Sequence, residues 1–348
     1  MTAADAPRPG GVVTDEPAES TDLVAGPART GRGWTVALVL LGTAGFLVPM
    51  SGIDIYYMRL LTDGIILGLA ALGVGFLFRQ TGLLSLGHAL FFGSAGYLVV
   101  VAVRTWSLPL PLAVAMALVL SALLGLLVGS LSLRLSGIGF AMLTLVFGQA
   151  ALVWVTSTRL REYAGGLDGL RLPYSTDFFG LPLSDLQEPR IIWPVSWAVL
   201  LLAITAVVAI RRSRLGLVLE AMRENTQRAP FVGLSVNGPR VLAFTFTAVL
   251  AGAAGVLHSM HRGFIAPEAL HWSTSGEFLI QSLIGGIGTT PGPVLGAVLL
   301  VVFEDFVGGF SERWPTVLGL LLVATLVFFP GGVSDAATRV WRRIRRAA

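Results

Sequence analysis

Apolar runs long enough to cross a bilayer recur along almost the whole chain, and they restrict its fold more than any other feature. The chain has 348 residues, of which 54% are hydrophobic and 13% charged, and its mean hydropathy is +0.79. A soluble domain carries about 25% charged residues. Since roughly 20 consecutive apolar residues span the hydrocarbon core as a helix, we predict an all-α polytopic membrane protein.

Ten segments are predicted to cross the membrane, within a transmembrane domain over 34–335. The first span, 34–50, follows Arg29 and Arg32; we interpret it as an uncleaved anchor rather than a signal peptide, because many spans follow it. The other predicted spans are 57–78, 86–103, 108–132, 136–157, 193–210, 241–262, 277–288, 293–307 and 315–331.

The positions of the arginines predict the orientation. Basic residues concentrate on the cytoplasmic side of membrane proteins, so the polar insert 211–240 and the basic tail 336–348, which contains WRRIRR, are predicted to be cytoplasmic. Residues 1–33, rich in Pro, Gly, Ala and acids, are predicted to form a disordered cytoplasmic tail. This topology places the loop 158–192 outside and requires 277–307 to cross twice.

Composition also excludes several classes of protein. The chain has no cysteine and no lysine, so all 24 basic residues are arginine. A Walker A loop needs a lysine, and disulfides or thiolate metal sites need cysteine. We therefore expect no cofactor and no metal on this chain, and any ATP to be hydrolysed by another chain. The arginines lie at the ends of apolar segments, as in a membrane protein, so the net charge of +4 does not indicate nucleic-acid binding.

Two glycine-interrupted stretches are too broken for smooth helices. They are GLLSLGHALFFGSAGYL at 82–98 and LIGGIGTTPGPVLGAVL at 283–299. Short, broken segments in both halves of a transporter indicate the substrate pathway. Close helix packing through small residues explains the same pattern, and both interpretations remain open.

The insert 211–240 contains a predicted helix from Leu217 to Ala229, because no glycine or proline interrupts this stretch and Pro230 ends it. The helix is too short and too polar to span a membrane. One interpretation is an amphipathic helix lying on lipid headgroups. The stretch has no Trp or Phe to enter the lipid, so docking into a socket on another protein is favoured. Its polar side is formed by Glu220, Arg223, Glu224 and Arg228.

At these residues the chain resembles the branched-chain amino acid permease family of ATP-binding cassette (ABC) importers, and in particular its M-type subunit. Glu220-Ala221, with Gly233 downstream, resembles the EAA coupling loop of such permeases, although Met222 replaces the second alanine. TGLLSLGHALFFGSAGYL and APEALHWSTSGEFLIQSLIGGIGTTPGPVLGA resemble two further motifs of the family. The likeness covers about residues 55–331.

This resemblance implies a permease of the bacterial plasma membrane that performs no bond chemistry. The expected partners are an H-type permease subunit, two cytoplasmic ATPases that bind ATP and Mg²⁺, and an extracytoplasmic solute-binding protein. The cargo is expected to be a branched-chain or related amino acid. The expected ATPase-coupling residues are Leu217, Glu220, Ala221, Arg223, Glu224, Asn225, Arg228 and Gly233.

Candidates for the translocation pathway lie in the broken stretches or are polar side chains inside apolar spans. Glu277 and Gln281 share a helical face. Hydrogen bonding between helices is the competing interpretation for Gln149 and Gln281, and hydrogen-bonded packing for His88. The full set is Ser85, Gly87, His88, Gly93, Gln149, Ser275, Glu277, Gln281, Gly285 and Gly288.

Two other functional classes were compared with the importer. A secondary, ion-coupled transporter of small polar solutes needs coupling acids deep in its spans and leaves the polar insert unexplained. Ser85 and His88 share a helix face, which would suit an intramembrane hydrolase. Neither a carboxylate nor a glycine-serine elbow accompanies them, so this function is not favoured.

Charged and histidine residues near the outer ends of spans are expected to be structural. Arg59 and Asp63 are four residues apart, the spacing of an ion pair within one helix. His258 and His261 are predicted to lie at the membrane interface.

Overall fold

The computed structural model describes residues 42–173, 177–178, 181–182, 185, 187–224, 237–309, 316–317, 319–320, 323 and 331–334. The predicted tails 1–33 and 336–348 lie outside these residues. The elements below all belong to one compact unit, which begins at Ala44.

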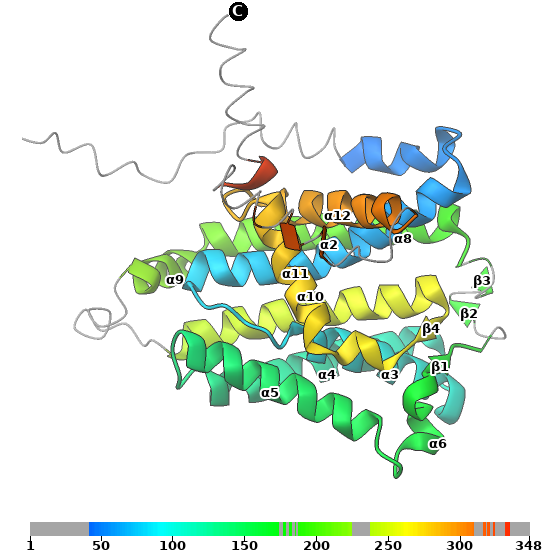
Figure 1. The fold of residues 1–348 in the computed structure, drawn as a ribbon, viewed down its shortest axis with the longest axis horizontal. Helices are drawn as coiled ribbons and strands as arrows, with labels where there is room; N and C mark the ends of the chain where they lie inside the picture. Colours follow the sequence, from blue (N-terminus) through cyan, green and yellow to red (C-terminus); the bar gives the residue numbers. More distant parts are fainter. Residues whose placement is uncertain are drawn as a thin grey trace, which may run out of the picture. The chain divides into compact units, whose positions relative to one another are not determined.

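Six helices of the described chain are long and apolar enough to cross a membrane (Figure 1). They are α2 (Ile55–Thr81), α3 (His88–Trp106), α4 (Leu110–Ser132), α5 (Ile138–Val155), α8 (Pro189–Arg212) and α10 (Asn237–Arg262). Shorter helices are η1 (Val48–Met50), α6 (Arg161–Ala164), η2 (Gly166–Asp168), α9 (Arg214–Glu224), η4 (Pro267–Leu270), α11 (Trp272–Gly285) and α12 (Gly292–Gly308). The prediction of an all-α polytopic membrane protein is confirmed.

Two small antiparallel ribbons accompany the helices. β1 (Leu170–Arg171) pairs with β4 (Phe264–Ile265), so that Leu170 lies opposite Ile265 and Arg171 opposite Phe264. β2 (Asp177–Phe178) pairs with β3 (Leu181–Pro182). The first ribbon ties the loop after α5 to the segment after α10.

Local sequence determines both ends of α2. The carboxylate of Asp54 accepts a hydrogen bond from the backbone N–H of Tyr56 (2.8 Å), which caps the first turn. The helix ends at Gly82, whose φ of +71° is a left-handed conformation that glycine adopts without strain. The following chain is therefore free to turn back into the bundle.

The central helix of the bundle is α10, which packs against α2, α3 and α4. Close approach depends on its glycines, because a Cβ on Gly255 would collide with the carbonyl oxygen of Phe92. One α10 aromatic, Phe244, packs edge-on against Phe91 of α3 and Phe140 of α5, with ring centroids 5.6 and 5.7 Å apart. A helix surrounded in this way is apolar on nearly every side.

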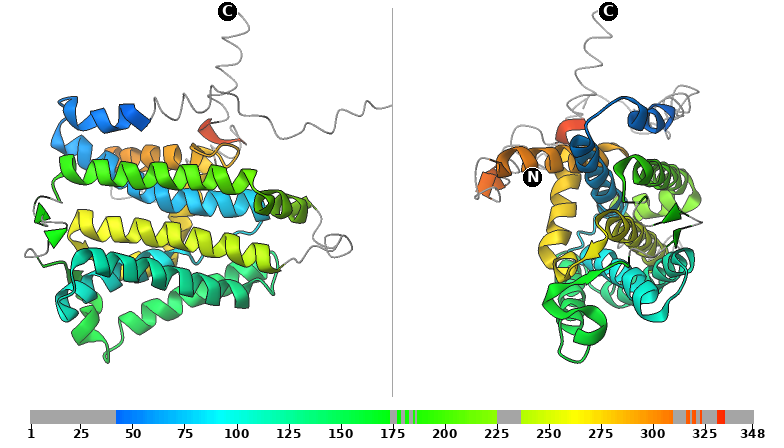
Figure 2. Two further views of the ribbon diagram at one scale, coloured as in Figure 1. Left: turned by 180° about the vertical axis from the view of Figure 1, so that it is seen from behind. Right: turned by 90° about the vertical axis from the view of Figure 1, so that its right-hand side faces the viewer.

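The long helices lie side by side and define two ends of the bundle (Figures 1 and 2). At the end that we call the α9 end, α2, α4 and α8 finish. At the other, the β1 end, α3, α5 and α10 finish, and the ribbon of β1 and β4 lies there. The loop between α5 and α8 and the insert around α9 therefore lie at opposite ends, as the predicted topology requires.

The chain after α10 passes between the two ends twice. The loop after α11 reaches the α9 end, where the guanidinium of Arg79 donates hydrogen bonds to the carbonyls of Ile287 (3.1 Å) and Gly288. The C-terminal part of α12 returns to the β1 end, where the Tyr56 hydroxyl donates to Asp305. The chain from the end of α10 to the end of α12 thus runs to the α9 end and back, and the predicted double crossing by 277–307 alone stays a prediction.

The ends of the predicted helices differ from those in the structure by up to five residues, and three of these differences bear on the site. α11 starts five residues before the predicted 277 and runs across the long helices (Figure 2). The insert helix begins at Arg214, three residues before the predicted 217. The predicted span 86–103 starts at His88, because the preceding residues are not helical. Residues 34–41 of the first predicted span and most of the last, 315–331, lie outside the described residues, so the total of ten spans stays a prediction.

Candidate functional site

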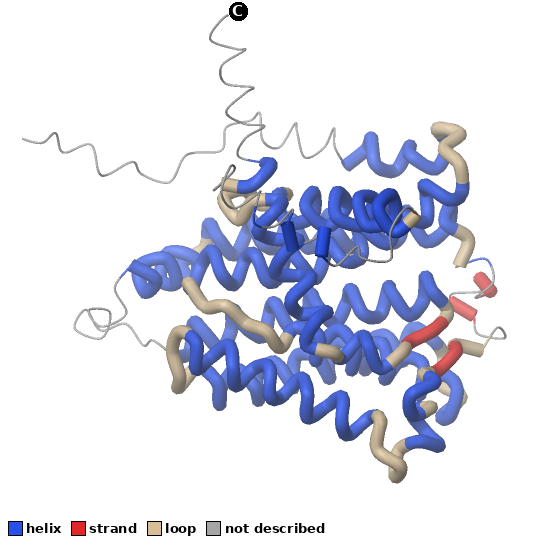
Figure 3. The backbone as a smooth tube through the Cα atoms, viewed as in Figure 1, coloured by secondary structure: helices blue, strands red, loops and turns tan. Residues whose placement is uncertain are grey.

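A non-helical segment enters the bundle from the α9 end. Residues 82–87 connect α2 to α3 and run back between the helices (Figure 3). The backbone N–H of Leu86 donates to Thr144 Oγ1 (3.2 Å), and a Cβ at Gly87 would collide with the Thr144 carbonyl oxygen. Because buried backbone groups need partners at membrane depth, these contacts to α5 allow the chain to be extended there.

A second non-helical segment enters from the β1 end and meets the first. After α10, the chain passes through β4 and η4 before α11 begins. The hydroxyl of Ser275 in α11 accepts a hydrogen bond from the backbone N–H of Ala89 (2.8 Å), in the first turn of α3. A Cβ at Gly93 would lie 2.5 Å from Cγ of Leu270, so α3 and η4 are in close contact. The two broken segments thus meet inside the bundle.

His88 is fully buried near this junction. Its Nδ1 lies 3.1 Å from Ser85 Oγ and its Nε2 lies 3.1 Å from Thr247 Oγ1, so both ring nitrogens have partners. The rings of Phe91 and Phe244 lie edge-on to the imidazole. In the described part of the chain neither His88 nor Ser85 is hydrogen-bonded to a carboxylate, and His88 serves packing rather than hydrolysis.

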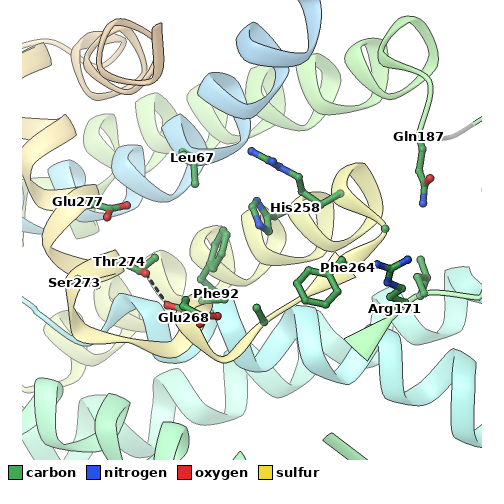
Figure 4. Close-up of a pocket in the computed structure, with 15 residues that line it drawn as sticks. Leu67, Phe92, Arg171, Gln187, His258, Phe264, Glu268, Ser273, Thr274 and Glu277 are labelled. Atoms are coloured by element: carbon green, nitrogen blue, oxygen red, sulfur yellow. Dashed lines mark hydrogen bonds between the residues drawn. The ribbon is translucent and has the colours of Figure 1, made fainter. Parts of the chain in front are cut away.

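A cavity of about 840 Å³ lies beside the second broken segment (Figure 4). This volume falls in the range of small-molecule sites, roughly 300–1,000 Å³. Apolar walls come from Leu67, Phe92, Leu172, Phe264, Ala266 and Ala269. Its polar lining is Arg171, Gln187, His258, Arg262, Glu268, Ser273, Thr274 and Glu277.

Charges of opposite sign lie at different places in this cavity. Figure 4 shows Arg171 and Gln187 at one end, and Glu268, Ser273, Thr274 and Glu277 at the other. The cavity therefore has a basic end beside the ribbon of β1 and β4, and an acidic end beside α11.

Arg262 is already neutralised by the buried Asp63 of α2. Its Nη2 lies 2.8 Å from Oδ2 and its Nε lies 3.3 Å from Oδ1, so the pair has two hydrogen bonds. His261 Nε2 lies 3.6 Å from the same carboxylate. The expected pairing of Asp63 with Arg59 is wrong, because α10 supplies the partner. His261 lies at the end of α10, where its side chain is buried between the helices.

A second cavity, of about 680 Å³, lies along α5. Its lining is mostly apolar and includes Val146, Val153 and Trp154, whose side chains are exposed. It also includes Gln149, whose Nε2 is buried without a hydrogen-bond partner among the described residues. A polar amide on such a surface is expected to face protein or a pathway rather than lipid.

The helix α9 has one packed and one free side. Leu219 and Met222 are almost fully buried beneath it, whereas Leu217 is 54% exposed. The exposed positions Leu217, Glu220, Ala221 and Glu224 follow the spacing i, i+3, i+4, i+7 and form one face. We call these four residues the α9 face.

Arginines attach α9 and its neighbours to the loop between α11 and α12. Arg223 of α9 donates to the carbonyl of Arg79 (2.7 Å) at the end of α2. Arg79 in turn donates to the loop carbonyls described above, and Arg211 of α8 donates to Thr290 Oγ1 (2.8 Å). The electrostatic attraction of Glu220 reaches both Arg79 and Arg211. We call Arg79, Arg211 and Arg223 the arginine ties.

Comparison with known proteins identifies the family. A family model described as the permease component of the branched-chain amino acid transport system matches residues 56–329. The chain belongs to this family. It is a membrane-embedded ABC permease subunit, and the resemblance inferred from its motifs is confirmed. Family membership also decides against an ion-coupled secondary transporter.

Individual relatives agree with this assignment. The permease is 28% identical over 298 residues to the high-affinity branched-chain amino acid transport system permease protein LivM of Escherichia coli, which covers 80% of this chain and 68% of the relative. It is 34% identical over 113 residues to LivH of the same organism, covering 32% and 36%. It is 33% identical over 134 residues to the autoinducer 2 import system permease protein LsrC of Klebsiella pneumoniae, covering 36% and 39%. No solved structure matches the chain.

The predicted pathway residues fall into two groups in the permease. Gln149 and Glu277 line the two cavities. Gly288 is exposed in the loop held by Arg79. The others are buried at contacts between helices or between the two broken segments: Ser85, Gly87, His88, Gly93, Ser275, Gln281 and Gly285.

The predicted coupling residues also fall into separate groups in the structure. Four of them form the α9 face, whereas Arg223 is one of the arginine ties. The permease uses this arginine to hold α9 against α2, so it is not part of the free face. Asn225, Arg228 and Gly233 lie outside the described residues.

Several cavity residues were not predicted as site residues. Arg171 and Phe264 lie in two-residue strands, whose pairing joins segments that are far apart in the permease. His258 was expected at the interface, yet it lines the cavity and packs against Phe92, with ring centroids 5.2 Å apart. The one available signal was the set of polar residues before and at the start of α11, which includes Glu268, Ser273 and Thr274.

Proposed function

We propose that this permease forms half of the translocation pathway of an ATP-driven importer of branched-chain or related amino acids. An H-type permease subunit supplies the other half, and two cytoplasmic ATPases bind ATP and Mg²⁺. A solute-binding protein delivers the amino acid from outside. The complex lies in the bacterial plasma membrane, with both termini of this chain in the cytoplasm.

The cargo follows from the relatives. LivM and LivH are both named as permease proteins of a high-affinity branched-chain amino acid transport system. This chain is similar to LivM over most of its length. A cavity with apolar walls and polar side chains of both charge signs is compatible with a small amino acid that carries an aliphatic side chain.

The observation that carries the coupling role is the α9 face. Leu219 and Met222 hold the helix on the bundle, while the opposite side presents a leucine, an alanine and two glutamates. A helix that lay on lipid would place its apolar side toward the membrane. Here that side is already covered by protein, so the remaining face is available to a groove on another protein.

The arginine ties give docking a mechanical consequence. A displacement of α9 is passed by Arg223 to the end of α2, and by Arg79 and Arg211 to the loop after α11. Because α11 carries Glu277 into the cavity near the opposite end, movement of the ATPases is transmitted to the cavity through a contiguous set of hydrogen bonds.

A co-purification experiment tests this function. The wild-type complex is expressed from its native operon, solubilised and purified through a tag on this chain, and compared with Leu217→Arg. We expect the ATPases to co-purify with wild type and to be lost in the variant, because a large cation on the α9 face blocks a fitted groove. Leu167→Arg is the matched control, since Leu167 is 80% exposed at the β1 end. Equal recovery of ATPases with Leu217→Arg would overturn the docking role.

A further inference from the structure

The acidic end of the large cavity holds a carboxylate without a cationic partner. Glu277 is half-buried on α11, and within the described part of the chain it forms no ion pair. Glu304 of α12 lies close enough to add repulsion between like charges. Placing an unpaired carboxylate in such surroundings costs free energy unless a cation neutralises it.

Asp63 differs from Glu277, because a cationic side chain of the same bundle neutralises it. Asp63 receives two hydrogen bonds from Arg262 and lies beside His261. The chain contains no lysine, so it has no ammonium group of its own to offer Glu277. Ionisable residues inside membrane bundles usually mark a substrate or ion path.

The surroundings of Glu277 favour an ammonium group over a metal ion. The described residues contain no group of three or more His, Cys, Asp or Glu side chains that could hold a metal. Thr274 donates its proton to the carbonyl of Glu268 (2.8 Å), which leaves its oxygen free to accept a hydrogen bond. An ammonium group has three donors for acceptors of this kind.

The rest of the cavity fits the remainder of an amino acid. Leu67 and Phe92 offer apolar contact next to the acidic end, and His258 Nδ1 is buried there without a partner among the described residues. The positive charge of Arg171 at the basic end attracts a carboxylate (Figure 4). Because an α-amino acid carries its carboxylate on the same carbon as its ammonium group, the acidic end itself can contact the ammonium group and the aliphatic side chain, whereas Arg171 acts on the solute only from a distance.

We propose that Glu277 binds the ammonium group of the transported amino acid in this cavity, with the Thr274 hydroxyl as a second acceptor. The permease itself then selects for an amino group, in addition to any selection by the solute-binding protein. Neutral amides and deaminated acids have no ammonium group, so they leave the Glu277 carboxylate unpaired. They are therefore poor ligands, because a buried polar group without its partner costs free energy. This inference rests on the proposed function, because it assumes that an amino acid reaches the cavity.

Binding to the assembled complex is the first test. The complex in lipid nanodiscs, without the solute-binding protein, is examined by saturation-transfer NMR with L-leucine and with 4-methylpentanoate, which has the same carbon chain without the amino group. We expect saturation of leucine only. Equal saturation of both compounds would overturn the proposal, and this result does not depend on the folding of any variant.

Substitutions then test whether Glu277 is the residue that binds the ammonium group. Glu277→Gln is expected to weaken leucine binding about 30-fold or more, as when one partner of a desolvated charge pair is removed. Glu277→Asp keeps the charge and should retain part of the binding. The matched control is Glu304→Gln, which removes a neighbouring charge that does not line the cavity; we expect its binding within about threefold of wild type. Wild-type binding by Glu277→Gln would sink the assignment.

Uptake separates this inference from the proposed function. The complex is reconstituted in proteoliposomes with internal ATP and the solute-binding protein, and uptake of radiolabelled leucine is measured. If wild type binds leucine through Glu277 but shows no ATP-dependent uptake, the importer proposal fails and the ammonium site stands. If wild type transports leucine and Glu277→Gln transports it equally well with an unchanged KM, the ammonium site fails and the importer stands.

Discussion

The two ends of the bundle use arginine in different ways. At the α9 end, Arg79 and Arg223 donate to backbone carbonyls and Arg211 to a threonine hydroxyl. At the β1 end, Arg262 binds a carboxylate beside a cavity. A guanidinium has five donors in a rigid fork and stays charged, so it serves both purposes. The arginines at the α9 end therefore hold segments of backbone together, whereas the arginine at the β1 end pairs with an acid beside the cavity.

The largest expected effect separates the two sides of α9. Leu219→Ala removes a fully buried side chain, and we expect a loss of about 2–5 kcal/mol in the free energy of unfolding. Leu217→Ala, on the α9 face, is expected to change stability by no more than about 0.5 kcal/mol. Thermal unfolding in detergent measures both. Equal destabilisation by the two substitutions would show that α9 has no free face.

A smaller effect is expected from breaking the ion pair at the β1 end. Asp63→Asn leaves Arg262 with a weaker acceptor, and we expect a loss of about 1.5–3 kcal/mol, as for a hydrogen bond to a charged group. Arg59→Gln is the matched control. It should have little effect, because α10 and not Arg59 supplies the partner of Asp63. Thermal unfolding of the purified complex gives the ranking, and a larger loss with Arg59→Gln would contradict the structural pairing.

The arginine ties at the α9 end should affect coupling more than stability. Arg79→Ala removes the hydrogen bonds to Ile287 and Gly288, so only the Arg211 tie still connects this end of the bundle to the loop after α11. Mutations along a coupling path change the coupling between sites by about 0.5–2 kcal/mol, so we expect leucine transported per ATP hydrolysed to fall several-fold. Arg79→Lys keeps one donor group and should lose less. Uptake and ATP hydrolysis are measured together in proteoliposomes; a proportional fall in both would indicate a loss of folded complex instead.

Much of the fold was predictable because its signals are local. Apolar runs gave most spans to within a few residues, and the polar composition of the insert indicated a helix of its own. The pairing of Asp63 was not predictable, since Arg262 is 199 positions away whereas Arg59 has the spacing of a helical ion pair. The large cavity was not predictable either, because residues far apart in the sequence form it. It is assembled by the pairing of Leu170 with Ile265, which periodicity within either segment does not reveal.

Glycine-rich stretches had two possible meanings in the sequence, and the structure shows where each applies. Gly93 and Gly285 lie at tight contacts, where a Cβ would meet Leu270 and the backbone of Gly292. Their role is close packing, which positions the broken segments. Among the predicted pathway residues, the polar side chains that line the cavities are Gln149 of α5 and Glu277 of α11. Small residues therefore bring the broken segments together, and larger polar residues line the cavities beside the helices.

The smallest expected effect concerns Gln149, on the apolar surface of α5. Its Nε2 is buried without a partner among the described residues, and the surrounding side chains are exposed. If a second permease subunit covers this surface, the amide finds an acceptor there, and Gln149→Leu should weaken subunit pairing by about 0.6 kcal/mol, the average for hydrogen bonds between membrane helices. Dissociation of the two permeases in increasing detergent measures this change. If lipid covers the surface instead, removing an unpaired amide should stabilise the isolated chain and leave pairing unchanged. Val153→Leu, on the same cavity wall, controls for altered packing, because it changes volume without changing polarity.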